Sequence, residues 1–157
     1  MKATTINSKK RIAFAVHPDK KTDLIEWSYF NKELLMQHEI IACGDAANIL
    51  EGTLHKTVHK FLTGPNGSYQ ELCNLIAEGQ VDTIIFLRGA DETPLQKNSI
   101  RTIMHAALEA DIIIAGNKIS AEFILTSPLM NKEETPGNDG YSFGEKADIS
   151  LKKNNAA

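Results

Sequence analysis

The chain has 157 residues, enough for one domain with a buried core, and 42% of them are hydrophobic and 24% charged, as in an ordinary globular protein. The formal net charge of −3 leaves no basic excess, which argues against nucleic acid or an anionic membrane as a partner. No apolar run is long enough to span a membrane, and the polar first ten residues do not resemble a signal peptide, so we expect a cytoplasmic protein.

The first half of the chain alternates apolar runs with helical patterns. After a polar lead-in over residues 1–10, the run RIAFAV at residues 11–16 predicts a buried strand, and a helix is expected from Pro18 to about His38. Residues 39–43 predict a second strand. Asp45 then predicts the N-cap of a short helix through Leu50, and a weaker third strand is expected at residues 57–62 (TVHKFL).

The middle of the chain reads as a turn, a helix and a strand. Gly64-Pro65-Asn66-Gly67 is a turn sequence, and Ser68 with Glu71 fits a capping box at the start of a helix that ends at Gly79. Residues 81–87 form a nearly continuous apolar run, which is typical of a strand covered on both faces. The glycine turn before the helix is either an anion site or a tight turn without a ligand.

The last part predicts a polar loop at residues 88–98, a helix at 99–110, a strand at 111–115 and a helix at 120–126. Residues 131–157 are polar, and we expect this segment to be mobile or to pack elsewhere. The alternation of strands and helices predicts one α/β domain over residues 11–130, with a central parallel sheet and helices on both faces.

In such folds ligands bind beyond the carboxyl ends of the strands. This rule selects His17, Cys43-Gly44-Asp45, Thr63-Gly64 and the loop at residues 88–98 as one candidate site. The two cysteines, Cys43 and Cys73, form no CxxC motif and are expected to be reduced thiols. No metal-ligand spacing accompanies them, so we expect no metal site. We also expect no cofactor.

Several motifs follow one another at a specific spacing over residues 11–130. They are AVHPDKK, ACGDAANIL, LTGPNG, AEGQVDTIIF and AGNKISAEFILTSP. In this order they resemble the methylglyoxal synthase family. The resemblance implies a single Rossmann-like domain, an enzyme that removes phosphate from dihydroxyacetone phosphate, and a homohexamer. The same domain also serves as a regulatory ligand-binding module in larger proteins such as carbamoyl phosphate synthetase.

The resemblance carries several binding residues over to this chain. His17 matches the family histidine, Lys21 the phosphate lysine, and Thr63 with Gly64 the phosphate cradle; Asn48 and Asn117 also match. The expected ligand is a small phosphorylated or anionic metabolite. The candidate ligand-binding residues are His17, Lys21, Cys43, Gly44, Asp45, Thr63 and Gly64.

Most catalytic positions of the family are substituted. Residues 43–47 read CGDAA where the family has TGTTG, so the threonine hydroxyls are lost and a carboxylate is added. Tyr69 stands in place of the family's catalytic-base aspartate, and Gly89 in place of another aspartate. In the next loop a family histidine and aspartate fall on Gln96 and Ser99, or, with the loop shifted by one residue, on Leu95 and Asn98.

Two hypotheses follow. The chain is either a catalytically degenerate member that keeps a small-anion pocket, which the substitutions favour, or an active synthase or related lyase. His17 is the one weak catalytic candidate. Asp45 is expected to be a helix N-cap, with an ion pair to Lys21 as the alternative. Asp91 and Glu92 are expected to be solvated loop charges, or else replacement carboxylates.

Overall fold

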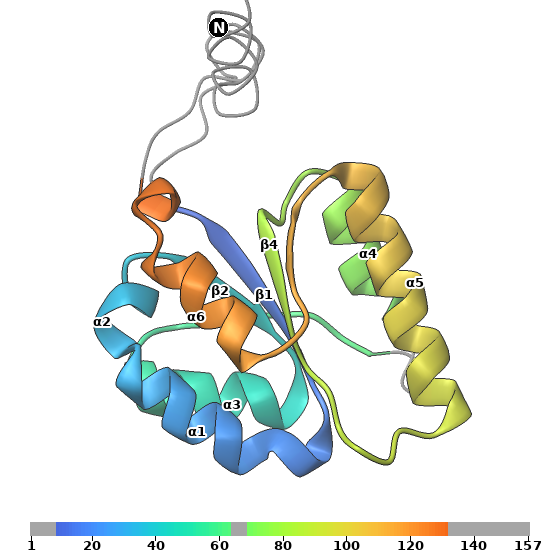
Figure 1. The fold of residues 1–157 in the computed structure, drawn as a ribbon, viewed down its shortest axis with the longest axis horizontal. Helices are drawn as coiled ribbons and strands as arrows, with labels where there is room; N and C mark the ends of the chain where they lie inside the picture. The colour runs from blue at the N-terminus through green and yellow to red at the C-terminus, as the bar shows by residue number, and fades with distance from the viewer. Residues whose placement is uncertain (1–8, 64–68, 132–157) are drawn as a thin grey trace, which may run out of the picture.

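The computed structural model describes residues 9–63 and 69–131, which form an α/β domain (Figure 1). Within these residues a five-stranded sheet has the order β3-β2-β1-β4-β5, and every neighbouring pair is parallel. The predicted α/β class with a parallel central sheet is therefore confirmed. The strands are β1 (Arg11–Val16), β2 (Glu39–Ala42), β3 (His59–Lys60), β4 (Thr83–Leu87) and β5 (Ile113–Ala115).

Helices cover both faces of the sheet. Figure 1 shows α1, α3 and α6 on one face and α4 and α5 on the other. The described α-helices are α1 (Lys21–Phe30), α2 (Lys32–Leu35), α3 (Gly44–Leu54), α4 (Gln70–Ala77), α5 (Pro94–Ala110) and α6 (Lys118–Thr126). Two short 3₁₀ helices, η1 (Pro18–Lys20) and η3 (Pro128–Asn131), complete the described elements. None of the described helices is long and apolar enough to cross a membrane.

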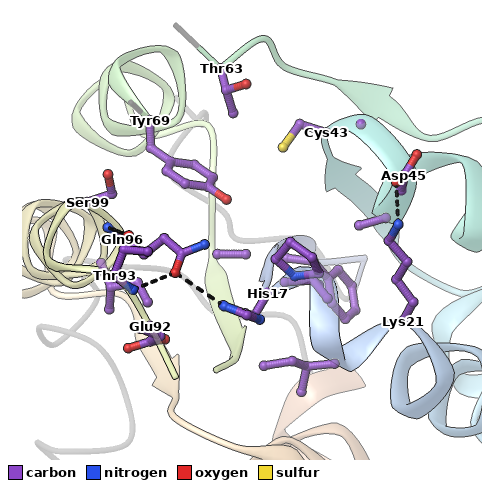
Figure 2. A pocket seen from close by; sticks show the side chains of 18 of the residues that line it. His17, Lys21, Cys43, Asp45, Thr63, Tyr69, Glu92, Thr93, Gln96 and Ser99 are labelled. Carbon is purple, nitrogen blue, oxygen red and sulfur yellow. Dashed lines mark hydrogen bonds and ion pairs between the residues drawn. The ribbon is translucent and has the colours of Figure 1, made fainter. Parts of the chain in front are cut away.

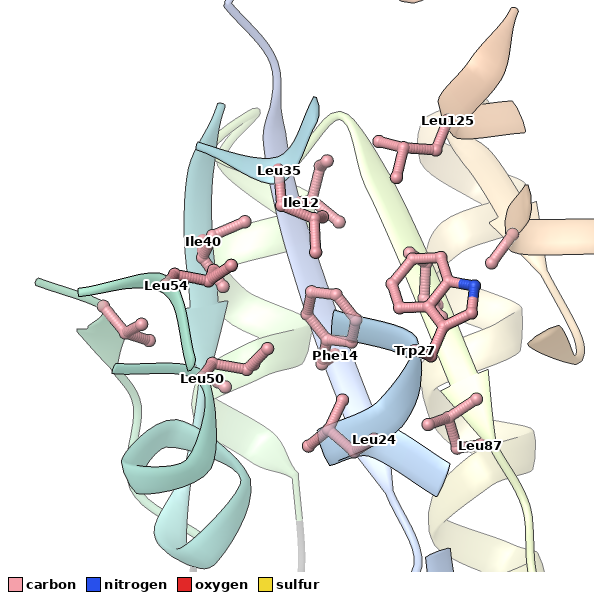
Figure 3. Close-up of a cluster of buried hydrophobic side chains, with 14 of the residues drawn as sticks. Ile12, Phe14, Leu24, Trp27, Leu35, Ile40, Leu50, Leu54, Leu87 and Leu125 are labelled. Atoms are coloured by element: carbon pink, nitrogen blue, oxygen red, sulfur yellow. The ribbon is translucent and has the colours of Figure 1, made fainter. Parts of the chain in front are cut away.

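The central strand β1 shows why the apolar runs in the sequence are continuous. Ile12 and Phe14 pack into the core beneath α1, α3 and α6, whereas Ala13 and Ala15 pack against α4 and α5. Because successive side chains of a strand point to opposite faces, a strand buried on both sides needs apolar residues at every position. In the larger core the Phe14 and Trp27 rings meet edge to face, with centroids 6.1 Å apart (Figure 3).

The single helix expected from Pro18 to about His38 is wrong. The chain forms η1, α1 and α2 instead, with a break at Asn31. The side-chain amide of Asn31 donates to the Trp27 carbonyl and to Glu122 Oε1 of α6, both at 3.0 Å. A side chain that bonds to the backbone in this way competes with regular helix geometry, so the break is fixed by a contact with a distant helix.

Two further helix boundaries differ from the prediction. Helix α3 continues past Leu50 to Leu54. Leu54 is fully buried and lies on the same apolar face of the helix as Ala47 and Leu50, so packing of that face stabilises the extra turn. Helix α5 begins at Pro94, inside the expected loop at residues 88–98, because Thr93 forms an N-cap there. The other strands and helices lie where expected, within a few residues at their ends.

The end of α4 at Gly79 is confirmed. Gly79 has φ of 76°, and the backbone N–H groups of Gly79 and Gln80 donate to the carbonyls of Ile76 and Leu75. A left-handed residue after the last turn is the usual way to close a helix, and glycine adopts it without strain. Ser68 and its expected capping box lie outside the described residues, as does the Gly64–Gly67 turn.

A buried histidine makes the stability of the fold depend on pH. His38 is 1% exposed, and its Nδ1 accepts a hydrogen bond from the backbone N–H of Lys10 at 2.9 Å. Burial, followed by the nearby Lys10 and Lys56 charges, lowers the pKa of His38. The folded state therefore resists protonation, whereas the unfolded chain takes up the proton below the ordinary histidine pKa of 6.5.

We expect this contribution of His38 to stability to be fully present above pH 6.5 and to be lost as the pH falls below it. Urea unfolding at about pH 7.5 and at about pH 5.0, which lie above and below the ordinary histidine pKa, measures this loss of unfolding free energy. The variant His38→Asn keeps an acceptor for the Lys10 N–H but does not titrate. It should lose less stability between the two pH values, and equal losses in both proteins would contradict the assignment.

Candidate active-site cavity

A cavity of about 500 Å³ lies at the carboxyl ends of β1, β2 and β4 (Figure 2). Six of the seven sequence-predicted binding residues line it: His17, Lys21, Cys43, Gly44, Asp45 and Thr63. The seventh, Gly64, lies outside the described residues. These segments are far apart in the chain, and they meet because the strands of a parallel sheet all end at the same edge. That they bind a ligand stays a prediction.

His17 follows β1 directly, and the protein uses both of its ring nitrogens. Nδ1 accepts a hydrogen bond from the backbone N–H of Asp19 at 3.0 Å, and Nε2 lies 3.3 Å from Gln96 Oε1. Gln96 Oε1 also accepts from the Thr93 backbone N–H at 2.8 Å, which fixes the amide as the acceptor. The His17 proton is therefore on Nε2 and is donated to Gln96, so the ring keeps no free group for a ligand.

The His17 ring rests on Gly89, which follows β4. A Cβ atom at Gly89 would lie 2.4 Å from Nδ1 of His17 and 2.6 Å from Cγ and Cε1. Contacts this short do not occur between non-bonded atoms, so any side chain at this position must displace the imidazole. The sequence identified Gly89 as a substituted position. It could not reveal this role, because Gly89 and His17 are brought together only by the pairing of β1 with β4.

The predicted N-cap role of Asp45 is wrong. Cys43 is the N-cap of α3, and Asp45 lies in the first turn, where its carboxylate Oδ2 is 2.6 Å from Lys21 Nζ. The alternative of an ion pair with Lys21 is the one observed. The hydrogen bond and charge of Lys21 lower the pKa of Asp45, so the carboxylate stays ionised at neutral pH. The cavity thus supplies its own counter-ion to its lysine.

Two further groups of the cavity are held in their uncharged forms. Burial raises the pKa of the Cys43 thiol to about 11. Burial also raises the pKa of the Tyr69 phenol to about 12, with a smaller contribution from the charge of the nearby Cys43. The Tyr69 ring also packs against Phe61, with centroids 5.9 Å apart, and Figure 2 shows its hydroxyl end directed into the cavity. At neutral pH both groups can donate hydrogen bonds, but neither is available as a base.

Glu92 differs from the expectation of a solvated loop charge. Its side chain is 3% exposed and lines the cavity, and its two oxygens accept from Arg88 Nη2 at 2.6 Å and Nε at 3.1 Å. The bond to Arg88 lowers the pKa of this carboxyl. Asp91 is exposed, as expected. A carboxylate with so little exposed surface is stabilised by its arginine partner, and the sequence alone did not predict this pair.

Gln96 is positioned by a capping box that was not predicted from the sequence. The Thr93 hydroxyl accepts from the Gln96 backbone N–H, and the Gln96 side chain accepts from the Thr93 backbone N–H. The signal was present as Thr-Pro-Leu-Gln, with Pro94 in the first turn. The helix α5 therefore starts early and brings Leu95, Gln96 and Ser99 to the cavity.

Taken together, the lining offers hydrogen-bond donors but no unengaged base among the described residues. In residues 9–63 and 69–131, no cluster of three His, Cys, Asp or Glu side chains could hold a metal ion. The described lining of the cavity contains one lysine, Lys21, and its ammonium group is already bound to the Asp45 carboxylate. Each ionisable side chain of the described lining is therefore either held in its protonated form or already bound to a partner.

No protein-family model matches the chain. The methylglyoxal synthase of Yersinia enterocolitica serotype O:8 / biotype 1B is 33% identical over 140 residues, which is 87% of this chain and 92% of that protein. That of Coxiella burnetii (strain RSA 493 / Nine Mile phase I) is 33% identical over 135 residues, 84% of this chain and 94% of its own length. The crystal structure of methylglyoxal synthase from Elizabethkingia anophelis NUHP1 superimposes with a TM-score of 0.73 at 30% identity, covering 82% of this chain and 85% of that one. This chain belongs to the methylglyoxal synthase family.

Proposed function

We propose that this chain is a catalytically degenerate methylglyoxal synthase-like protein that keeps its cavity as a binding site for a small anion, such as a phosphorylated metabolite. The state of the ionisable groups in the described lining supports this proposal. Asp45 and Glu92 are each bound to a cation, and the Cys43 and Tyr69 pKa values of about 11 and about 12 keep both groups protonated. No free base then faces a bound ligand.

The binding part of the proposal rests on three residues of the cavity lining: Lys21, Thr63 and Gly44, the first residue of α3. Within the described residues, the N-cap Cys43 makes no side-chain hydrogen bond to the helix, so its side chain does not compete with a ligand for the first backbone N–H groups of α3. A lysine and the N–H groups of a helix N-terminus both attract an anion. Asp45, which is bound to Lys21, reduces the share of the lysine.

Isothermal titration with dihydroxyacetone phosphate at about pH 5.5, where a phosphate monoester with a second pKa of about 6 is mostly a monoanion, tests both parts of the proposal. We expect a binding signal without formation of methylglyoxal, and a Lys21→Gln variant that binds at least about tenfold more weakly, since a charged hydrogen bond contributes roughly 1.5–3 kcal/mol. Lys97→Gln, at an exposed position of α5, is the matched control and should bind as the unmodified protein does. Absence of binding, or equal binding by Lys21→Gln, would contradict the anion site.

An active lyase is the second candidate, and one observation favours it. Glu92 is a carboxylate that lines the cavity with a side chain only 3% exposed, and it could stand in for a missing base if a ligand displaced Arg88. In that case Glu92→Gln would remove the activity. The bond to Arg88, which lowers the pKa of Glu92, makes this the weaker candidate.

The assembly and location stay predictions. The homohexamer rests on the family resemblance, and three exposed apolar side chains on α1 and α6 support an interface between subunits: Phe30 at 88%, Ile119 at 70% and Phe123 at 72% exposure. Light scattering at micromolar concentration would test it. The cytoplasmic location and the lack of a cofactor rest on the sequence alone.

A further inference from the structure

The charges around the cavity are unusual for an anion site. Its described lining contains one cationic side chain, Lys21, and two carboxylates, Asp45 and Glu92. Lys21 Nζ is 2.6 Å from Asp45 Oδ2, and Glu92 is bound to Arg88 by two hydrogen bonds. The lysine that would hold an anion is therefore already neutralised, by a carboxylate that also faces the cavity. Figure 2 shows this pair on the side of the cavity opposite Gln96.

We infer that Asp45 is a specificity-determining residue, which makes the cavity select a small monoanion over a dianion of the same shape. This inference rests on the proposed anion site and names the charge class of its ligand. The reason is a difference in scaling. The cost of removing an ion from water grows with the square of its charge, whereas its attraction to a fixed site grows only in proportion to its charge.

A lysine without a carboxylate partner attracts a dianion strongly enough to offset the free energy of removing that dianion from water. At Lys21 most of this attraction is cancelled, because an anion that reaches Nζ also comes close to the Asp45 carboxylate and is repelled by it. The small net attraction that remains can offset the dehydration free energy of a monoanion, but not the larger dehydration free energy of a dianion. Asp45 cannot avoid the conflict by taking up a proton, since Lys21 lowers its pKa and keeps it ionised at neutral pH.

Sulfate and methanesulfonate are suitable probes, because both present a tetrahedral SO₃ face but carry two charges and one charge at all pH values near neutrality. Titration calorimetry at fixed pH and ionic strength should show tighter binding of methanesulfonate to the unmodified protein. In Asp45→Asn the ratio of the two affinities should shift toward sulfate by about fivefold or more, the effect of one unit charge at roughly 4 Å even in a water-like dielectric.

The matched control is Asp111→Asn. It removes the same charge at the other end of α5, the 17-residue helix that begins at the cavity, and asparagine tolerates the left-handed φ of 57° found there. This variant should leave the affinity ratio unchanged, whereas Lys21→Gln should weaken both anions. Thermal denaturation of Asp45→Asn, whose side chain is 68% exposed, should match that of the unmodified protein.

Tighter binding of sulfate to the unmodified protein would overturn the inference and leave the anion site standing. An equal gain for both anions in Asp45→Asn would do the same, since it would show a general effect of charge without selection. If neither anion binds to the unmodified protein or to Asp45→Asn, both the inference and the proposed anion site are wrong.

Discussion

The purified protein will form methylglyoxal from dihydroxyacetone phosphate at least about a thousandfold more slowly than the ~10 s⁻¹ that is typical of enzymes. The reaction needs a base within hydrogen-bond distance of a carbon-bound proton, with a pKa close to the working pH. Each positioned acid or base contributes about 10²- to 10⁴-fold to the rate. A site that lacks both the positioned base and the positioned acid is therefore expected to lose most of the catalytic rate enhancement.

The two carboxylates of the described lining are poor bases where they stand. Lys21 lowers the pKa of Asp45 through a 2.6 Å contact, and Arg88 lowers that of Glu92 through two hydrogen bonds. A carboxylate that is stabilised in its ionised form gains less by accepting a proton, so its power to remove one from carbon falls.

The other ionisable groups are unavailable for different reasons. Tyr69, with a pKa of about 12, and Cys43, with a pKa of about 11, are protonated at neutral pH. His17 accepts from the Asp19 N–H at Nδ1, and its Nε2 proton is directed to Gln96. It therefore has no free lone pair with which to take a proton from a substrate.

The measurement is the formation of methylglyoxal and of inorganic phosphate, assayed separately at high protein concentration, with an active family enzyme in parallel. A rate of about 1 s⁻¹ or more, which lies within the normal range of enzymes, would refute the degenerate-site proposal. A rate that high, abolished in Glu92→Gln but kept in Asp91→Asn, would identify Glu92 as the base.

Replacement of Gly89 by alanine is expected to displace the His17 imidazole and to destabilise the fold by about 1–3 kcal/mol, the usual cost of overpacking. The added Cβ would lie 2.4 Å from His17 Nδ1. The ring, which is 10% exposed, has little room to move without losing its bonds to Asp19 and Gln96. Urea unfolding measures the stability, and nitrogen NMR of the imidazole reports whether Nε2 still carries the only proton.

Gly52→Ala is the matched control. Gly52 lies in α3, and a Cβ atom built there has nothing within 4 Å. Alanine is favoured over glycine inside a helix, so this variant should gain up to about 1 kcal/mol of stability and leave the His17 signals unchanged. If Gly89→Ala were as stable as the unmodified protein and its imidazole signals were unaltered, the assigned position of His17 on Gly89 would be wrong.

The sequence by itself determined the class of the fold and the edge of the sheet at which the cavity lies. The run at residues 12–16 is apolar at every position, as expected for a strand buried on both faces, and β1 (Arg11–Val16) includes these residues. Parallel strands bring their carboxyl ends together, so His17, Cys43 and Thr63 could be placed at one site without knowledge of the strand order.

The tertiary structure decided which partner each of these groups has. His17 and Gln96 are 79 residues apart in the chain, and the Asn31 and Glu122 side chains that break the first helix are 91 apart. Local signals such as caps and apolar spacing act over one or two turns of helix, and they say nothing about which distant side chain will lie opposite. The state of the cavity depends on such distant pairs, because a buried charge or ring nitrogen is available for chemistry only if the packed fold has left it without a partner.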